Sequence, residues 1–145
     1  MARFEIHPQL LADCHRIGCL QLCHVLLHKN AVVPWFILVP ETAVTDLLDL
    51  PPESRNAVMS EASMVSQLIK TALGWPKVNF AAIGNLVPQL HLHVVGRRPD
   101  DPCWPAPVWG NLTASREYSA TDLDRMIALL TERCGLKPTT DGSAT

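Results

Sequence analysis

The feature that most constrains the fold is a run of strictly alternating residues at positions 89–94, Gln-Leu-His-Leu-His-Val. Side chains on a β-strand point to opposite faces of the sheet with a period of two. The three apolar side chains of the run therefore share one face, which suits a hydrophobic core. Gln89, His91 and His93 share the other face, about 7 Å from one to the next because a strand rises about 3.3 Å per residue. This polar row is the first candidate for a functional site.

Length and composition favour one packed domain. At 145 residues the chain falls within the usual size of a single domain. We expect that domain to cover residues 1–136, and the polar residues 137–145 to form a flexible tail. Hydrophobic residues make up 48% of the chain and charged residues 18%, which indicates a globular core rather than disorder. The net charge of −2 predicts no broad positive surface for nucleic acid.

The cysteines and the N-terminal sequence indicate a cytoplasmic protein. The five cysteines are odd in number and form no Cys-x-x-Cys pair, so we expect free thiols in a reducing compartment. The first residues, Met-Ala-Arg-Phe-Glu, lack the apolar core of a signal peptide. No apolar run approaches the length of about 20 residues that a membrane span needs. We therefore expect no membrane association.

Apolar runs separated by turn residues predict five strands. Residues 34–40 form a continuous apolar segment bounded by prolines, which at this length indicates a buried strand. Most links between the runs are short, which implies antiparallel pairing. The expected strands cover about residues 14–20, 22–28, 34–40, 77–83 and 90–97.

Apolar residues at intervals of three and four predict an amphipathic helix over residues 53–73, between the third and fourth strands. Pro51 and Pro52 suit its start, and Gly74 suits its end. The predicted class is α+β, with a five-stranded antiparallel sheet and two main helices. A second helix is expected over 121–134, and short helical turns near 4–13 and 45–50.

Three interpretations of the polar row are open from the residues alone. In the first, His91 and His93 are structural and are satisfied by hydrogen bonds. In the second, two imidazoles on one side of a strand bind a metal, with further ligands from Cys23, His24 or His28. In the third, an imidazole attacks phosphorus and forms a phosphohistidine intermediate, because its reference pKa of about 6.5 leaves it largely neutral at pH 7.

The third interpretation requires a specific set of neighbours. One ring nitrogen must be free and the other held as a donor, and further donors must balance the charge on the phosphate oxygens. Gln89, His91 and His93, with Asn85 on the link before the strand, could supply this set. The sequence therefore predicts these four residues at one site.

A proline-rich loop follows the polar row. Residues 99–110 contain four prolines, which restrict the backbone around Trp104 and Trp109. Such a loop could cover the edge of the core, or it could form an aromatic wall over a ligand. Both interpretations are open from the sequence.

These motifs together resemble the signature of the histidine-triad (HIT) superfamily, His-φ-His-φ-His-φ-φ with φ apolar. The resemblance includes the Val-Pro-Trp-Phe-Ile-Leu-Val-Pro segment at 33–40 and covers about residues 14–110. The pattern is most similar to that of bacterial HIT proteins with a Gln-Leu-His-φ-His variant and a Trp-Pro-x-Pro-Val-Trp-Gly loop. The signature region here reads Asn79…Gly84-Asn85-x3-Gln89-Leu-His91-Leu-His93-Val-Val-Gly-Arg97.

The resemblance implies an α+β fold, a homodimer with joined sheets, and nucleotide binding. It implies hydrolase or nucleotidyl-transferase action at the α-phosphate of a dinucleoside polyphosphate, such as a diadenosine polyphosphate, or of a nucleoside phosphoramidate. By position, His91 is similar to the family's nucleophile and His93 to the histidine that contacts phosphate. Asn85, Asn79 and His28 are similar to residues of the nucleotide pocket, with His28 at the ribose. No required cofactor or metal site is implied, although a divalent cation can accompany the nucleotide.

Two departures from the family pattern bear on catalysis. Gln89 stands in place of the first histidine, and an amide can donate a hydrogen bond but cannot transfer a proton. Phe36 stands near the place of a further histidine that supports the last one. General-acid catalysis is typically worth about 10²–10⁴-fold. An enzyme is therefore the first hypothesis, a nucleotide-binding module with little turnover is the second, and a metal protein that uses His91 and His93 is the third.

Overall fold

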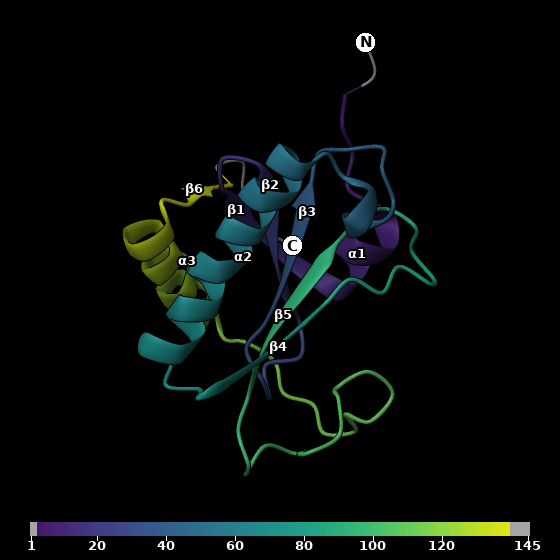
Figure 1. The fold of residues 1–145 in the computed structure, drawn as a ribbon. Coiled ribbons are helices and arrows are strands. Elements are labelled where there is room, and N and C mark those ends of the chain that lie inside the picture. The colour runs from purple at the N-terminus through teal and green to yellow at the C-terminus, as the bar shows by residue number, and fades with distance from the viewer. Residues whose placement is uncertain (1–2, 140–145) are drawn as a thin grey trace.

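A computed structural model describes residues 3–139 of the chain. Figure 1 shows α2 and α3 close together on one side of the sheet. The predicted α+β class and both main helices are confirmed. The elements in chain order are α1 (Pro8–Asp13), β1 (Cys14–Cys19), β2 (Cys23–His28), β3 (Trp35–Pro40), the 3₁₀ turn η1 (Leu47–Asp49), α2 (Pro52–Thr71), β4 (Lys77–Ala81), β5 (Leu92–Arg97), α3 (Ala120–Cys134) and β6 (Lys137–Pro138).

The sheet has six strands in the order β4-β5-β3-β2-β1-β6, and all neighbouring pairs are antiparallel. The five predicted strands are present, and the pairing expected from the short links is confirmed. The sixth strand, β6, is only two residues long and pairs with Gly18 and Cys19 of β1. A Cβ atom at Gly18 would collide with the Lys137 carbonyl oxygen, so this close approach requires glycine. Residues 137–138 thus belong to the sheet rather than to the predicted tail, and residues 140–145 lie outside the described part.

The sheet face under α2 and α3 forms the main hydrophobic core. Leu90, Leu92 and Val94 lie in this core, as their alternation with the polar row predicts. Removing such side chains from water stabilises a fold by about 1.5–3 kcal/mol each. The helix stripe that packs on them consists of Val58, Ala62, Val65, Leu68 and Ile69.

The ends of the two main helices follow from local sequence. α2 begins at Pro52 directly after Pro51, in keeping with the tolerance for proline in a first turn. α3 begins with a capping box in which Ser119 and Asp122 exchange hydrogen bonds, and its C-cap Gly135 adopts φ 70°. None of the helices within residues 3–139 combines the length and hydropathy that crossing a membrane requires.

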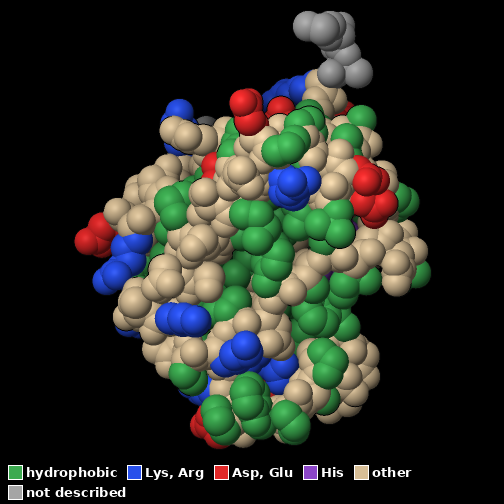
Figure 2. All heavy atoms as spheres, viewed as in Figure 1, with side chains coloured by type: hydrophobic (Ala, Val, Ile, Leu, Met, Phe, Trp, Pro, Cys, Tyr) green, Lys and Arg blue, Asp and Glu red, His purple; other side chains and the backbone are tan. Residues whose placement is uncertain are grey.

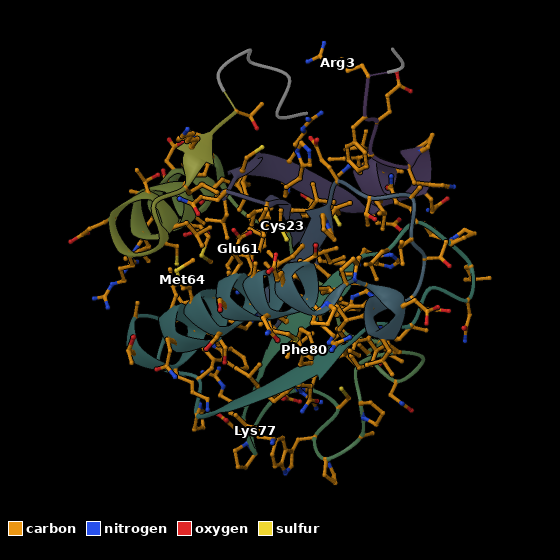
Figure 3. All side chains as sticks on the ribbon, turned by 45° about the horizontal axis from the view of Figure 1, so that its top comes forward. Arg3, Cys23, Glu61, Met64, Lys77 and Phe80 are labelled. Atoms are coloured by element: carbon orange, nitrogen blue, oxygen red, sulfur yellow. The ribbon has the colours of Figure 1, made fainter. Side chains whose placement is uncertain are left out.

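One charged side chain of α2 lies inside the core. Glu61 is buried, and its carboxylate accepts the backbone N–H groups of Leu22 at 3.0 Å and Cys23 at 2.9 Å. Figure 3 shows Glu61 on α2 beside Cys23. A buried carboxylate is costly unless it is hydrogen-bonded. These bonds therefore hold the β1–β2 hairpin against the helix.

The opposite sheet face is covered by α1 and by irregular segments. α1, the link between β4 and β5, and the loop after β5 pack there on a second apolar cluster. Figure 2 views the molecule from the α2–α3 side, where the histidine side chains are almost hidden. The second cluster includes Leu10, Leu26, Trp35, Ile37, Val87, Val95 and Val108.

Candidate functional site

A cleft of about 940 Å³ opens on the sheet face that lies opposite α2 and α3. This volume falls in the usual range for small-molecule sites. Side chains of β2, β3 and β5 form its floor, and three segments form its walls: residues near α1, the β4–β5 link and the loop after β5. The residues that line the cleft include His7, His28, Trp35, Asn85, His91, His93 and Trp109.

His91 and His93 meet in this cleft. β5 begins at Leu92, so Gln89 and His91 precede the strand rather than lie within it as the alternation predicts. The two imidazole rings nevertheless lie edge to face, with their centroids 5.0 Å apart. Both side chains are 7% exposed. The structure therefore brings together the two histidines of the predicted row.

The hydrogen bond of His91 determines which ring nitrogen is free. Its Nδ1 lies 2.7 Å from the backbone carbonyl oxygen of Gln89. A carbonyl oxygen can only accept, so Nδ1 carries the proton of the neutral ring. Nε2 keeps its lone pair, which is the condition for an imidazole nucleophile.

His93 has the opposite arrangement. The indole N–H of Trp35 donates to His93 Nδ1 over 3.0 Å. Because Nδ1 accepts, neutral His93 carries its proton on Nε2 and can donate from there. The expectation that Phe36 lies at the supporting position is wrong. Phe36 points into the core on the other sheet face, as neighbours on a strand do, and Trp35 supports His93 instead.

The floor of the cleft is aromatic and uncharged near neutral pH. Burial, followed by the neighbouring rings of His91 and His28, lowers the pKa of His93 to about 4. Burial also lowers the pKa of His28, which Asp13 partly opposes. The ring of His28 stacks on Trp35, with centroids 4.2 Å apart and an interplanar angle of 11°. The floor therefore offers ring faces and N–H donors rather than positive charge.

Gln89 does not lie in the cleft, contrary to the prediction for the polar row. Its Oε1 accepts the backbone N–H of His7 at 2.8 Å, and its Nε2 donates to the carbonyl of Glu5 at 2.9 Å. Since Gln89 precedes β5, strand alternation does not direct its side chain. Both ends of the amide hold the N-terminal segment, and this segment places His7 in the cleft wall.

Of the two asparagines predicted for the nucleotide pocket, Asn85 lines the cleft and Asn79 does not. Asn79 lies on β4, where its Oδ1 accepts from Nη1 of Arg97 at 2.9 Å. The Arg97 side chain is 1% exposed and also pairs with Asp101 at 2.7 Å. A buried guanidinium needs hydrogen-bond acceptors. Asn79 supplies one of them to Arg97, which explains its position outside the cleft.

The two tryptophans of the proline-rich loop have different positions. Trp109 lines the cleft, and its ring centroid lies 5.2 Å from that of His93 and 6.1 Å from that of Trp35. Trp104 is 38% exposed and lies over the guanidinium of Arg97 at 5.6 Å. The aromatic-wall interpretation therefore holds for Trp109, and the covering interpretation holds for Trp104.

A second cleft of about 460 Å³ adjoins the first. The two clefts share Ile83, Gly84 and His91. Asp46 and Asp49, from the segment around η1, also line the second cleft. His91 is thus accessible from one space with aromatic walls and from another with carboxylates.

Two site residues, His7 and Trp35, did not follow from the sequence. His7 precedes α1, and its Nδ1 accepts the backbone N–H of Gln9 at 3.0 Å. The capping of α1 by His7 can be recognised from neighbouring residues. The hydrogen bond with Gln89 that brings His7 to the cleft joins residues far apart in the sequence, so it cannot be recognised in this way. Trp35 faces His93 because β3 and β5 pair with Ile37 opposite His93, a register that the sequence does not specify.

The metal interpretation has no ligand set in the described part of the chain. Within residues 3–139, no three His, Cys, Asp or Glu side chains come together in a way that could hold a metal ion. Of the extra ligands considered, Cys23 lies in the core on the other sheet face. His28 already accepts the backbone N–H of Asn30 at its Nδ1.

Nearly the whole chain is similar to known proteins of one family. The family model for the HIT domain matches residues 9–100. A histidine triad protein from Marinobacter aquaeolei is 37% identical, with a TM-score of 0.84, over 94% of this chain and 100% of that one. Histidine triad proteins from Bradyrhizobium japonicum and Sinorhizobium meliloti are 38% and 35% identical, both with a TM-score of 0.83, over 90% of this chain and 97% and 96% of theirs. No curated protein sequence matched. The chain therefore belongs to the HIT, or histidine triad, family.

Proposed function

We propose that this protein is a nucleotide hydrolase or nucleotidyl transferase in which His91 is the nucleophile. HIT proteins are generally nucleotide-binding hydrolases or transferases. The observation that carries the proposal is the 2.7 Å hydrogen bond from His91 Nδ1 to the Gln89 carbonyl, which leaves Nε2 free to attack. Nε2 bonds to the α-phosphorus while the bond to the leaving group breaks, and water then cleaves the nucleotidyl-histidine.

His93 stabilises the charge that develops on the phosphate. Its low pKa keeps the ring neutral, and Trp35 holds the proton on Nε2. A donor that is already oriented lowers the barrier without reorganising during the reaction. Asn85, also in the cleft, is a second donor, and the ring faces of His28 and Trp109 accommodate the nucleoside.

The ring N–H of His7 donates a hydrogen bond to the leaving group as negative charge develops there. Gln89 cannot transfer a proton, but it holds the segment that brings another imidazole into the cleft. Because His7 Nδ1 accepts from Gln9, its ring proton lies on Nε2. Replacing His7 with Ala should slow turnover by about tenfold for a poor amine or alcohol leaving group, and hardly at all for a nitrophenolate, because the lost hydrogen bond matters only where charge on the leaving group is poorly stabilised. An equal loss for both leaving groups would argue against this role.

The second cleft favours a phosphoramidate over a dinucleoside polyphosphate. A substrate with its nucleoside in the first cleft and its phosphate at His91 can extend into the adjoining space. There Asp46 and Asp49 would repel a polyphosphate and attract a cationic amine. Substrate panels for wild type and Asp46→Asn test this preference, which the variant should weaken.

A homodimer is part of the same proposal. Within residues 3–139, β4 is an edge strand that pairs with β5. Figure 3 shows Lys77 and Phe80 along this outer strand, and Phe80 is 39% exposed. An open edge with an exposed aromatic residue suits pairing with a second copy. Light scattering on wild type and on a variant with Phe80→Pro should give a dimer and a monomer, respectively.

The decisive experiment traps the intermediate. The protein is mixed with a labelled adenosine phosphoramidate and quenched, and the acid-labile adduct is mapped by mass spectrometry. We expect label on His91 in wild type and in the control His15→Gln, whose imidazole lies outside the cleft, and no label in His91→Ala. Turnover by His91→Ala at the wild-type rate would refute the mechanism. Nucleotide binding by calorimetry without adduct or product would instead identify a binding module.

A further inference from the structure

A second set of chemically active side chains lies near the ends of three neighbouring strands. Cys19 ends β1, His24 lies opposite it on β2, and Glu41 follows the end of β3. His24 is paired in turn with Val39, two residues before Glu41, so the three side chains share one face of the sheet. None of the three lines the cleft around His91.

The three side chains form a continuous hydrogen-bonded row. Cys19 Sγ lies 3.2 Å from Nδ1 of His24, and His24 Nε2 lies 2.8 Å from Oε1 of Glu41. An ionised carboxylate can only accept, so Nε2 carries the ring proton and Nδ1 is left to accept from the thiol. The Phe4 ring stacks on the His24 ring at an interplanar angle of 11°. A thiol, a base and a group that orients the base are therefore assembled in that order.

The other cysteines lack this environment, although all five lie within the described residues. Cys14 and Cys23 are buried, and burial raises the pKa of both thiols. Cys103 and Cys134 are half-buried like Cys19, but their S–H groups donate to the backbone carbonyls of Ala106 and Met64. Cys19 is thus the cysteine with an imidazole nitrogen as its partner.

We propose that Cys19 is a reactive thiol for small hydroperoxides, with His24 as its general base and Glu41 as the residue that orients His24. The Cys19 sulfur attacks one peroxide oxygen while the S–H proton passes to Nδ1 of His24. The S–O bond forms and the O–O bond breaks, and the departing oxygen takes the proton from Nδ1. Sulfur is oxidised by two electrons to a sulfenic acid, and the hydroperoxide is reduced to an alcohol and, for hydrogen peroxide itself, to water.

The surroundings of Cys19 require a base and select a small reagent. Burial raises the pKa of the Cys19 thiol, Arg16 and Lys137 oppose this, and Glu41 adds to it. Preformed thiolate is therefore scarce, and reaction depends on proton transfer to His24 in the same step. Cys19 is half-buried and Phe4 covers the His24 ring, so reagents of a few atoms have access.

The test compares Cys19 with Cys134 inside one full-length protein. The protein is treated with dilute hydrogen peroxide and dimedone, which traps sulfenic acids, and each labelled cysteine is quantified by mass spectrometry over time. We expect Cys19 to be labelled at least about tenfold faster than Cys134, because general-base help is worth at least that much. Equal rates at the two cysteines would overturn the proposal.

Variants and pH then separate chemistry from structure. The Glu41 side chain is 57% exposed, so Glu41→Gln should leave the fold intact and lower the Cys19 rate severalfold, whereas His24→Gln should lower it to the Cys134 level. In wild type the Cys19 rate should depend less steeply on pH than the Cys134 rate, because the His24 imidazole takes the thiol proton within the reacting step. The Cys134 rate should rise by about tenfold per pH unit as long as its thiol is protonated, and burial raises the pKa of that thiol. Unchanged rates and pH profiles in folded Glu41→Gln and His24→Gln would refute the role of the row.

Discussion

The two faces of the central sheet are built in different ways. On the α2–α3 face, Leu90, Leu92 and Val94 meet an apolar helix stripe, and each contact follows from a regular period in the sequence. On the cleft face, His91 and His93 are surrounded by three irregular segments that are far apart in the chain. The α2–α3 face therefore stabilises the fold through the apolar surface area that it buries. The cleft face instead positions reactive side chains through individual hydrogen bonds. Substitutions on the two faces should separate these properties.

The largest effect is expected from His91→Ala. Loss of the nucleophile should reduce kcat/KM by about 10³-fold or more, because no other group can form the covalent intermediate. The free energy of unfolding should fall by less than in Leu92→Ala, since the His91 side chain borders the open cleft and makes one hydrogen bond, to the Gln89 carbonyl. Nucleotide turnover and urea unfolding measure the two quantities. A large loss of stability would mean that the faces are not separable at this residue.

Leu92→Ala tests the opposite face through the next residue in the chain. Leu92 is fully buried in the core, so the cavity should reduce the free energy of unfolding by about 2–5 kcal/mol. The folded fraction should keep a kcat close to that of wild type. Urea unfolding and active-site titration on the same samples give both values. Unaltered stability would contradict the division between the two faces.

Acid should destabilise the protein through the cleft face. Burial, His91 and His28 lower the pKa of His93 to about 4, whereas an unfolded histidine titrates at about 6.5. Between these values the unfolded state binds a proton that the folded state does not. Stability should thus fall as the pH drops through this window, by up to about 1.4 kcal/mol per pH unit. Urea unfolding across the window should give a flatter profile for His93→Gln, and an identical slope in that variant would count against the assignment.

Trp35→Phe removes the donor to His93 and keeps an aromatic ring. Without the indole N–H, the proton of His93 is no longer held on Nε2. We expect kcat/KM to fall about tenfold, the usual worth of one well-placed hydrogen bond. The control Trp104→Phe, on the covering side of the loop, should leave turnover unchanged. Equal effects of the two substitutions would remove the special role of Trp35.

Gln89→Ala should affect turnover indirectly and for poor leaving groups only. The variant loses two hydrogen bonds to the N-terminal segment, so unfolding should become easier by about 1–2 kcal/mol. Turnover should fall only through the displaced His7, so a nitrophenolate ester should react at the wild-type rate. If Gln89→Ala lost as much kcat/KM as His91→Ala with every leaving group, the Gln89 amide would have to contact the phosphate directly.

Regular elements were predictable because their signals are local. The apolar period of residues 53–73 gave the helix, and the proline boundaries of residues 34–40 gave the central strand. Alternation correctly separated Leu92 from His93. These patterns depend on neighbours in sequence, which any residue-by-residue analysis can follow.

The misplaced residues share a dependence on distant partners. Gln89 precedes β5, where alternation no longer applies, and its amide is drawn to the backbone of residues 5–7. The Asn79 side chain accepts a hydrogen bond from the buried Arg97 guanidinium and does not line the cleft. Phe36 lies on the core face of β3 and Trp35 on the cleft face. Trp35 rather than Phe36 therefore supports His93. Register and burial decide these cases, and a single sequence specifies neither.

Arg97 has a consequence for how a ligand meets the cleft. Its guanidinium donates to Asp101 at 2.7 Å and to the Ala106 carbonyl at 2.8 Å, and it therefore anchors the loop that carries Trp109 from within. Burial would raise the pKa of Asp101, but hydrogen bonds from Arg97 and from two backbone N–H groups lower it overall, so the pair stays charged. The conformational entropy of this loop is thus lost when the chain folds, not when a molecule docks. An incoming ligand meets a rigid wall, and its affinity is not reduced by a cost of loop ordering.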